Sequence, residues 1–323
     1  MKEPSSQQHG SRTVVAIIGA GSIGTGFAVV HASAGRDVVI HDVSKRQRDA
    51  VPGQIDSIAA DLVDAGLLDE NDKNLVARIR VEPSLEEATS GAGFIHECAP
   101  EDLDVKRDLV TAIDKYAPDD AVIASASSAI PASEIAENIP GRSRCLVAHP
   151  GNPPFLLRTI EIVPAPFTSA EATDSARNLL SQAGMTPILV KKEVRGFVFN
   201  RLQGALLREA YCLVRDGVAS VEDIDCLVRD GLGLRWSVVG PFEAVDLNTR
   251  GGIGRHAKLL GPAYAAMGAE RGQDDPWTED LVHEVEAQRR SVLPLDAWEE
   301  RVAWRNRRIM SLLAARDAID EQK

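Results

Sequence analysis

The sequence predicts an α/β protein, with a doubly wound, mostly parallel sheet followed by an all-helical C-terminal domain. Up to residue 191, short apolar β-branched runs alternate with stretches of helical periodicity, and after that point the strand pattern stops. A length of 323 residues is more than one hydrophobic core usually serves, so we expect two domains. We predict them at residues 12–191 and 192–323.

Seven apolar runs have the length and composition of strands that are buried on both faces of a sheet. They are residues 13–18, 37–41, 93–97, 121–125, 145–148, 159–163 and 186–190. Apolar residues at helical spacing predict helices between them, at 54–65 and 104–116. This alternation of strands and helices favours parallel pairing, because a parallel crossover has to carry the chain back to the same edge of the sheet.

The chain after residue 191 has only helical patterns. Residues 196–216 are apolar on most sides, which predicts a buried helix. Ser220 stands three residues ahead of Asp223, a spacing typical of a helix start. Further helices are predicted at 282–290 and 298–315. We expect the helical domain to pack against its twin in a homodimer, since the 196–216 helix has more apolar sides than one neighbour can cover.

Composition and charge exclude several classes of function. The chain has 48 Asp and Glu against 36 Lys and Arg, a formal charge of −12, and 4% aromatic residues. An acidic surface with few aromatic rings is unsuited to nucleic acid, and no apolar run is long enough to span a membrane. The four cysteines are far apart, without a C-x-x-C pair, which favours free thiols in a reducing compartment. We expect a cytoplasmic protein with no nucleic-acid, membrane or metal partner.

A glycine motif directly follows the first predicted strand. Gly19, Gly21 and Gly24 form G-x-G-x-x-G between a strand and a helix. The first glycine permits a tight turn, the second lets the backbone approach a pyrophosphate, and the third allows close packing of helix and strand. The helix N-terminus then offers free N–H groups and a positive dipole end to the phosphates. The segment therefore predicts a Rossmann-type dinucleotide site.

The acidic residue that this site requires lies at the end of the second predicted strand. Asp42 follows the motif at about the expected distance. Its carboxylate would bind both ribose hydroxyls and repel a 2′-phosphate, so we predict NAD as the cofactor. Lys45 and Arg46 come soon afterwards and leave NADP as the alternative.

An NAD-dependent enzyme that oxidises an alcohol needs a base near the hydroxyl. His149 opens a Pro- and Gly-rich turn after a predicted strand, the end where ligands bind in an open parallel sheet. A structural turn histidine is the alternative. His31, His41 and His96 lie in or beside predicted sheet-domain elements, and we interpret them as structural.

Three further polar residues are candidates around that base. Glu161 lies between isoleucines in a strand and would be satisfied by pairing with His149, although a solvent-facing edge residue is the alternative. The hydroxyls of residues 125–128 end another strand, where they could reach a substrate or simply serve the turn. Asn200 is polar on an apolar helix and could bind the reacting oxygen or a neighbouring helix.

Ordered motifs extend this pattern over nearly the whole chain. They are G-A-G-S-I-G at 19–24, A-P-E-D-L-D-V-K at 99–106, S-A-S-S-A-I at 125–130, H-P-G-N-P-P at 149–154, V-R-G-F-V-F-N-R-L-Q at 194–203, D-G-L-G-L-R-W at 230–236, G-P-F-E-A-V-D-L-N at 240–248 and W-R-N-R-R at 304–308. With these motifs the chain resembles the 3-hydroxyacyl-CoA dehydrogenase family, and within it the lambda-crystallin/L-gulonate 3-dehydrogenase branch.

The resemblance implies a site and a reaction. It implies hydride transfer between NAD and the 3-hydroxyl carbon of a small 3-hydroxy acid, as in L-gulonate 3-dehydrogenase. The alternatives are a 3-hydroxyacyl-CoA such as 3-hydroxybutyryl-CoA, carnitine, and a non-enzymatic crystallin-like structural role. It assigns catalysis to Ser128, His149, Glu161 and Asn200; cofactor binding to Gly19, Gly21, Ser22, Ile23, Gly24, Asp42, Glu101 and Lys106; and substrate binding to Ser128, Asn152 and Asn200. Gly151 departs from the branch, which has a bulkier residue there.

The choice between an acid and a thioester depends on a cation. A small hydroxy acid brings a carboxylate into the pocket, and an arginine meets a carboxylate with two parallel bonds. Arg235, in a glycine-broken segment beside Trp236, is the residue that we predict for this role. The alternative is a structural salt bridge in the helical domain or across a dimer.

Overall fold

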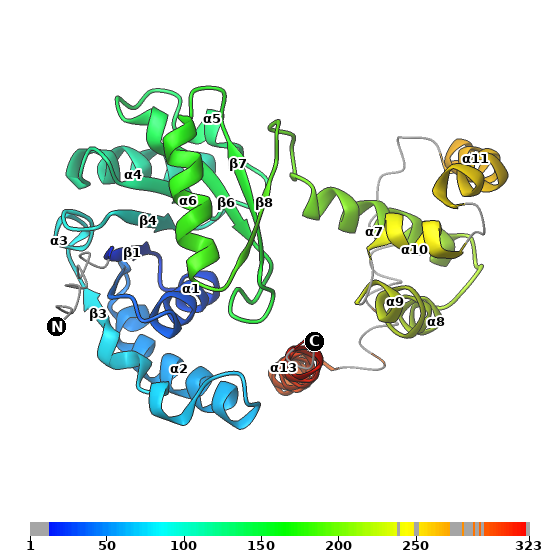
Figure 1. Cartoon of the computed structure of the whole chain (residues 1–323), viewed down its shortest axis with the longest axis horizontal. Coiled ribbons are helices and arrows are strands. Elements are labelled where there is room, and N and C mark those ends of the chain that lie inside the picture. The colour runs from blue at the N-terminus through cyan, green and yellow to red at the C-terminus, as the bar shows by residue number, and fades with distance from the viewer. Residues whose placement is uncertain are drawn as a thin grey trace, which may run out of the picture. The chain divides into compact units, whose positions relative to one another are not determined.

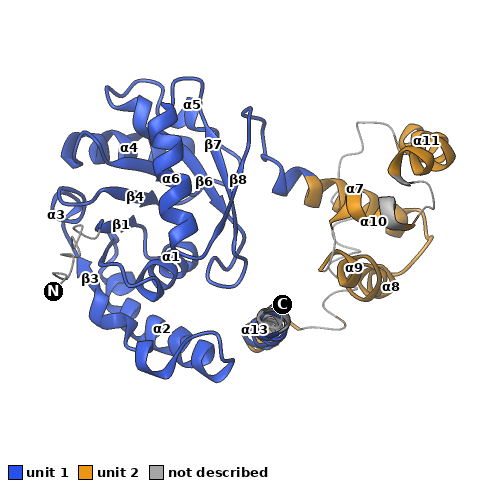
Figure 2. Cartoon of the chain, viewed as in Figure 1, with its two compact units in different colours: residues 1–201, 303–323 blue, residues 202–302 orange. Residues whose placement is uncertain are grey.

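The computed structural model describes residues 13–237, 240–248, 252–271 and 294–320, together with residues 280, 287 and 291. The chain forms two compact units (Figure 2). The first unit comprises the chain up to residue 201 and from residue 303, and the second comprises residues 202–302. The predicted division after residue 191 stays a prediction.

The first unit is built on an eight-stranded sheet with the order β3-β2-β1-β4-β5-β6-β7-β8. All neighbouring strands are parallel except β6 and β7. The strands are β1 (Val15–Ile18), β2 (Val38–His41), β3 (Ile79–Glu82), β4 (Phe94–Glu97), β5 (Val122–Ser125), β6 (Cys145–Pro150), β7 (Thr159–Pro164) and β8 (Thr186–Leu189). The chain moves outward from β1 to β3 and then returns to β4, so the strand order reverses between β1 and β4.

Helices cover both faces of this sheet (Figure 1), and successive strand residues point to opposite faces. One core contains Val15 and Ile17 of β1, together with α1 (Ser22–Ser33), α2 (Lys45–Asp64) and α6 (Ala170–Gln182). The other contains Ala16 and Ile18, together with α3 (Leu85–Thr89), α4 (Leu103–Tyr116) and α5 (Ala132–Ile135). Burial on two faces explains why the strands are continuously apolar.

The sequence prediction of a mostly parallel, doubly wound sheet is confirmed. All seven predicted strands are present, with ends that differ by one or two residues. The strand β3 was not predicted, because I-R-V-E is half-exposed at the sheet edge and carries two charges. Both predicted helices between strands lie within α2 and α4, apart from one residue at the end of the first.

Two histidines are fully buried in this unit. His31 of α1 and His96 of β4 approach within 3.0 Å through their Nε2 atoms, and His96 stacks on Phe27 at a centroid distance of 3.8 Å. Both Nδ1 atoms lack a hydrogen-bond partner among the described residues. Burial, and then the charge of Arg36, lower the pKa of His31 to about 3; burial, and then His31, hold the pKa of His96 well below its usual value. Both rings are therefore neutral.

Beyond β8 the described chain is helical, as predicted. The elements are α7 (Phe199–Arg215), α8 (Val221–Cys226), a π-helix (Leu227–Gly233), α9 (Leu234–Trp236), α10 (Pro241–Asn248), α11 (Gly252–Arg271) and α13 (Trp298–Asp320). Ser220 caps α8, accepting a hydrogen bond from the N–H of Asp223 at 3.1 Å. The predicted helix at 282–290 lies outside the described residues, apart from residue 287. No described helix is both long and apolar enough to cross a membrane.

The helix predicted at 196–216 requires two corrections. It begins at Phe199, because Gly196 and Phe197 have positive φ angles of 74° and 47°, which a right-handed helix does not accept. Within the single chain it is not a buried helix. Its fully buried residues are Cys212 and Val214, whereas Leu202 is 64% exposed.

Candidate functional site

The glycine loop lies where the strand order reverses, the point at which open α/β sheets bind ligands. Gly19 has a φ of +113°, and a Cβ there would stand 2.6 Å from the carbonyl oxygen of Cys98, which follows β4. A Cβ on Gly24 would stand 1.8 Å from the carbonyl oxygen of Gly19. Only glycine is accepted at these two positions, because the β1–α1 turn is in contact with β4 and with itself.

Gly21, the second glycine of the motif, faces open space. A Cβ on Gly21 would meet no atom within 4 Å. Gly21 is the N-cap of α1, whose first turn has no acidic residue and no side-chain cap. The N–H groups at the start of α1, at Ser22 and Ile23, are therefore available to an anion. This is the geometry that a pyrophosphate requires, and the loop fits a dinucleotide.

A cavity of about 970 Å³ extends from this loop to the end of β2. It is lined by residues that include Gly19, Gly21, Asp42, Arg46 and Cys98. The Asp42 carboxylate accepts hydrogen bonds from the N–H groups of Ala20 (2.8 Å) and Ser44 (2.7 Å), so it is fixed against the loop. Each oxygen keeps a second acceptor position that could receive a ribose hydroxyl.

A buried histidine–glutamate pair lies on neighbouring strands of the same sheet. The antiparallel register of β6 and β7 places His149 directly opposite Glu161. His149 Nδ1 and Glu161 Oε2 are 2.8 Å apart, and both side chains are buried. The His149 ring lies 5.7 Å from the Phe197 ring and 6.2 Å from the Phe199 ring. With Nδ1 directed at the carboxylate, Nε2 is the nitrogen that can exchange a proton with a ligand.

The second Glu161 oxygen is held by the start of α7. Oε1 accepts hydrogen bonds from the N–H groups of Val198 (2.7 Å) and Phe199 (3.0 Å). Burial by itself raises the pKa of Glu161, but the hydrogen bonds from His149, Phe199 and Val198 outweigh it, so the pKa is below its usual value. The left-handed turn at Gly196 and Phe197 aims these N–H groups at the carboxylate. Glu161 is therefore a fixed negative charge behind the imidazole.

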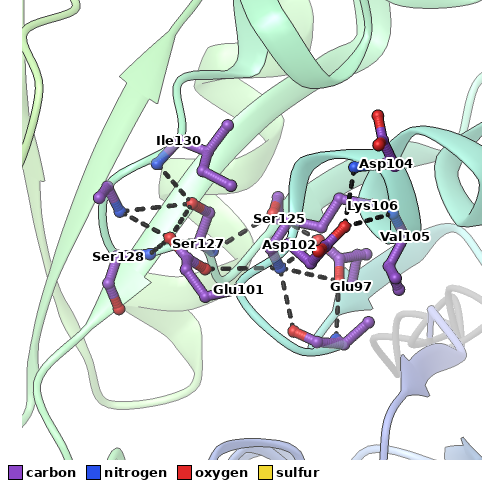
Figure 3. A network of polar contacts seen from close by, with 12 residues as sticks. Glu97, Glu101, Asp102, Asp104, Val105, Lys106, Ser125, Ser127, Ser128 and Ile130 are labelled. Carbon is purple, nitrogen blue, oxygen red and sulfur yellow. Dashed lines mark hydrogen bonds and ion pairs between the residues drawn. The ribbon is translucent and has the colours of Figure 1, made fainter.

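The serine segment after β5 is held by a carboxylate from the loop after β4 (Figure 3). Oε1 of Glu101 accepts from Ser127 Oγ at 2.7 Å and from the N–H groups of Ser128 and Ala129 at 2.9 Å each. On the other side of this segment, Asn200 Nδ2 donates to the carbonyl oxygen of Ser128 at 2.7 Å. The structure thus brings Ser128, Glu101 and Asn200 together.

Lys106 lies in the same network but is buried (Figure 3). Its ammonium is 3.1 and 3.0 Å from the two carboxylate oxygens of Glu97, and it donates to the carbonyl oxygen of Ala99 at 3.1 Å. Glu101 is more distant, at 3.8 Å. Ser125 Oγ also donates to Glu97, at 2.5 Å. A cofactor role for Lys106 would have to share an ammonium that Glu97 already neutralises, and this role stays a proposal.

Glu97 of this network was not predicted, whereas the Ser127 hydroxyl is one of those at residues 125–128 for which a role in the turn was the alternative. Glu97 and Ser127 are fully buried and organise the lysine and the serine segment. A signal was available for Glu97. It ends the otherwise apolar strand F-I-H-E, and a buried carboxylate requires a cation such as Lys106 nearby.

Three further residues singled out in the sequence take no part in the hydrogen bonds of this network. Asn152 is exposed in the turn after β6. Arg235 is exposed in α9 of the second unit, and its carboxylate-binding role stays a prediction. Gly151 is buried, and a Cβ there would stand 2.7 Å from Leu157 Cβ, so Leu157 occupies the space that a bulkier residue would need. In the described residues, no group of three or more His, Cys, Asp or Glu is placed to hold a metal ion.

Comparison with known proteins decides the family. Residues 14–194 match the NAD-binding domain of 3-hydroxyacyl-CoA dehydrogenase, and residues 196–294 match its C-terminal domain. The chain belongs to the 3-hydroxyacyl-CoA dehydrogenase family. It is an NAD-dependent oxidoreductase of this family, and the sequence predictions of family, cofactor and enzyme class are confirmed.

Relatives match nearly the whole length of the chain. A 3-hydroxyacyl-CoA dehydrogenase of Gibberella moniliformis is 36% identical over 94% of this chain and 94% of its own. The lambda-crystallin homolog of Bos taurus is 34% identical over 97% of each. Among solved structures, 5-formyl-3-hydroxy-2-methylpyridine 4-carboxylic acid 5-dehydrogenase, an NAD⁺-dependent dismutase, has a TM-score of 0.81 and 27% identity, with 96% of this chain and 99% of that chain covered.

Proposed function

We propose that this enzyme oxidises the 3-hydroxyl of a small 3-hydroxy acid, with L-gulonate as the first candidate. The observation that carries the proposal is the buried His149–Glu161 pair, whose Nδ1–Oε2 distance is 2.8 Å. The pair lies on β6 and β7, in the sheet that also holds the glycine loop. The bound NAD would supply the acceptor for the hydride that leaves the carbinol carbon.

In this proposal each polar residue has one task. His149 Nε2 takes the hydroxyl proton as the carbon–oxygen bond becomes a carbonyl, and Glu161 stabilises the imidazolium that results. Ser128 Oγ binds the reacting oxygen. Asn200 has two amide hydrogens, of which one is donated to Ser128 and the other can reach the same oxygen.

The experiment is a panel of substrates at equal enzyme concentration, in which the absorbance of NADH reports the reaction. L-gulonate, 3-hydroxybutyrate, 3-hydroxybutyryl-CoA and carnitine are compared by kcat/KM. The proposal expects L-gulonate or 3-hydroxybutyrate to exceed the other two by at least about tenfold, or roughly 1.4 kcal/mol. A preference for the thioester or for carnitine would refute the acid proposal, and no turnover of any of the four would favour the crystallin-like role.

Arg235 separates acid from thioester more sharply. We propose that its guanidinium binds the substrate carboxylate, because burying that charge without a cation is costly. The carboxylic acid in the name of the structurally similar dehydrogenase supports a substrate of this type. Arg235→Met should cut kcat/KM for the acid by about 2–3 kcal/mol, the scale of a charged hydrogen-bonded pair. A neutral ester of similar size is the control, and equal losses for acid and ester would contradict the role.

We also propose a homodimer through the helical region. Leu202, Leu206 and Leu207 of α7 are exposed in the single chain, and a partner would cover them. Light scattering at micromolar concentration should give twice the chain mass of 34.8 kDa. A monomeric mass would overturn this proposal.

A further inference from the structure

We propose that Glu101 is a positioning residue for the reaction, which fixes the Ser128 peptide so that the Ser128 hydroxyl faces the substrate. The proposal rests on the proposed role of Ser128. This task is additional to the direct cofactor contact that the family resemblance implies for Glu101, because the three donors below share Oε1 and leave Oε2 for a ligand.

Three hydrogen-bond donors converge on one carboxylate oxygen of Glu101. Ser127 Oγ and the N–H groups of Ser128 and Ala129 all point at Glu101 Oε1, at 2.7, 2.9 and 2.9 Å (Figure 3). Two consecutive N–H groups and a hydroxyl form an anion-binding turn, and bonds to an ionised acceptor are about twice as strong as neutral ones. The carboxylate therefore sets the conformation of the serine segment.

The main chain of Ser128 is held from both sides. Glu101 binds its N–H, and Asn200 Nδ2 binds its carbonyl oxygen at 2.7 Å. Within the described part of the chain, no residue binds Ser128 Oγ. The main chain of Ser128 is thus fixed by side chains from two other segments, while its hydroxyl is left for a ligand.

The fold does not depend on the Glu101 carboxylate. Removing Glu101 leaves the buried Lys106 ammonium paired with both oxygens of Glu97. Ser128 and Ala129 are exposed, so water can reach the N–H groups that lose their acceptor. Ser127 Oγ also accepts a hydrogen bond from the N–H of Ile130 at 2.8 Å, which remains. A Glu101→Ala variant should therefore fold.

The first test needs no substrate. Hydrogen exchange is followed by mass spectrometry on the peptide containing residues 126–131. In Glu101→Ala, the amides of Ser128 and Ala129 should exchange at least about tenfold faster than in the wild type. Glu101→Gln keeps an acceptor oxygen and should stay within about threefold of the wild type. Unchanged exchange in Glu101→Ala would overturn the proposal, whatever the substrate proves to be.

The second test asks whether Glu101 acts through Ser128. Glu101→Ala should lower kcat/KM by about 10- to 100-fold, the scale for misplacing a reacting group by about 1 Å. In a Ser128→Ala background the same change should cost less than about twofold, because a misplaced hydroxyl is then already absent. Each kcat/KM is measured for the hydroxy substrate at saturating NAD, so that a change in cofactor affinity does not enter the comparison. Asp104→Ala removes an exposed carboxylate three residues away and is the control that should match the wild type.

A role confined to the cofactor contact gives the opposite pattern. The loss in kcat/KM of Glu101→Ala at saturating NAD would then be the same with and without Ser128, and the amides of Ser128 and Ala129 would exchange at the wild-type rate. That result would overturn the positioning role. It would leave the proposed reaction standing, since the substrate panel on the wild-type enzyme tests that separately.

Discussion

Two buried histidine pairs lie in the sheet-forming unit, and they differ in what supports a proton. The His149 ring faces the Glu161 carboxylate, whose other oxygen is held by two backbone N–H groups. The only hydrogen-bond partner of the His31 ring among the described residues is the His96 ring, and the positive charge of Arg36 disfavours a proton on His31. Burial alone therefore does not make a histidine a base. A base also needs a neighbouring group that stabilises the protonated ring.

The largest expected effect breaks the first pair. His149→Gln should lower kcat by about 10²–10⁴, the usual contribution of a positioned acid–base group. The NADH Kd should be nearly unchanged, because the imidazole serves the substrate. Stopped-flow absorbance and fluorescence titration measure the two quantities. A variant that keeps more than about a tenth of wild-type kcat, with chemistry shown to be rate-limiting, would exclude His149 as the base.

The second prediction concerns the other pair and acid stability. The pKa values of His31 and His96 are lowered in the folded state, so below pH 6.5 the unfolded chain binds protons that the folded chain does not. The free energy of unfolding should therefore fall as the pH decreases below 6.5, with a slope that approaches about 1.4 kcal/mol per pH unit from His31 and a further loss in the same direction from His96. Urea unfolding between about pH 7 and 5 measures this slope.

A double variant supplies the control for that slope. His31→Leu combined with His96→Phe removes both titrating rings and keeps an aromatic ring against Phe27. Its stability should depend much less on pH in this range than that of the wild type. If the double variant keeps the slope unchanged, the buried pair is not its source.

The third prediction tests the carboxylate of the His149–Glu161 pair. The lowered pKa of Glu161 means that its ionised form stabilises the fold above its unfolded value of 4.5. Glu161→Gln should cost about 1–3 kcal/mol at neutral pH, the range for hydrogen bonds to a charged group. This difference from the wild type should shrink as pH falls below 4.5 through the folded pKa. A difference that stays constant down to about pH 3 would show that the ionised carboxylate is not what stabilises the fold.

The smallest effect concerns neither pair. Asp42 should make kcat/KM at least about tenfold higher with NAD than with NADP, about 1.4 kcal/mol. Asp42→Ser should narrow that ratio, since it removes the charge that meets a 2′-phosphate. Equal rates of the wild type with both cofactors would contradict the role of Asp42.

The cofactor half was predictable because its signal is contiguous. Gly19, Gly21, Gly24 and Asp42 lie within one strand–helix–strand unit, and two of the glycines meet a local steric demand. The helix at 199–215 was predicted in type but not in start or burial. Its start depends on the left-handed turn at Gly196 and Phe197, and its burial depends on what covers Leu202.

The polar network was only partly predictable because it is assembled from distant segments. Ser128 and Asn200 are 72 residues apart, and Glu161 is 37 residues from its donor at Val198. No pattern in the local sequence states that Glu101 reaches the serine segment or that Lys106 is buried. Those contacts come from the strand order, which brings the ends of β4 and β5 together.

The tight packing at Gly151 restricts the order in which mutations can accumulate. A side chain at that position would collide with Leu157 at its Cβ, an atom that cannot rotate away. An exchange of Gly151 for a larger residue would first be destabilising, while the same exchange after Leu157 has become glycine would meet no Cβ at position 157. The two positions are therefore epistatic. A library that varies both positions together can reach conformations of this turn that successive single changes cannot.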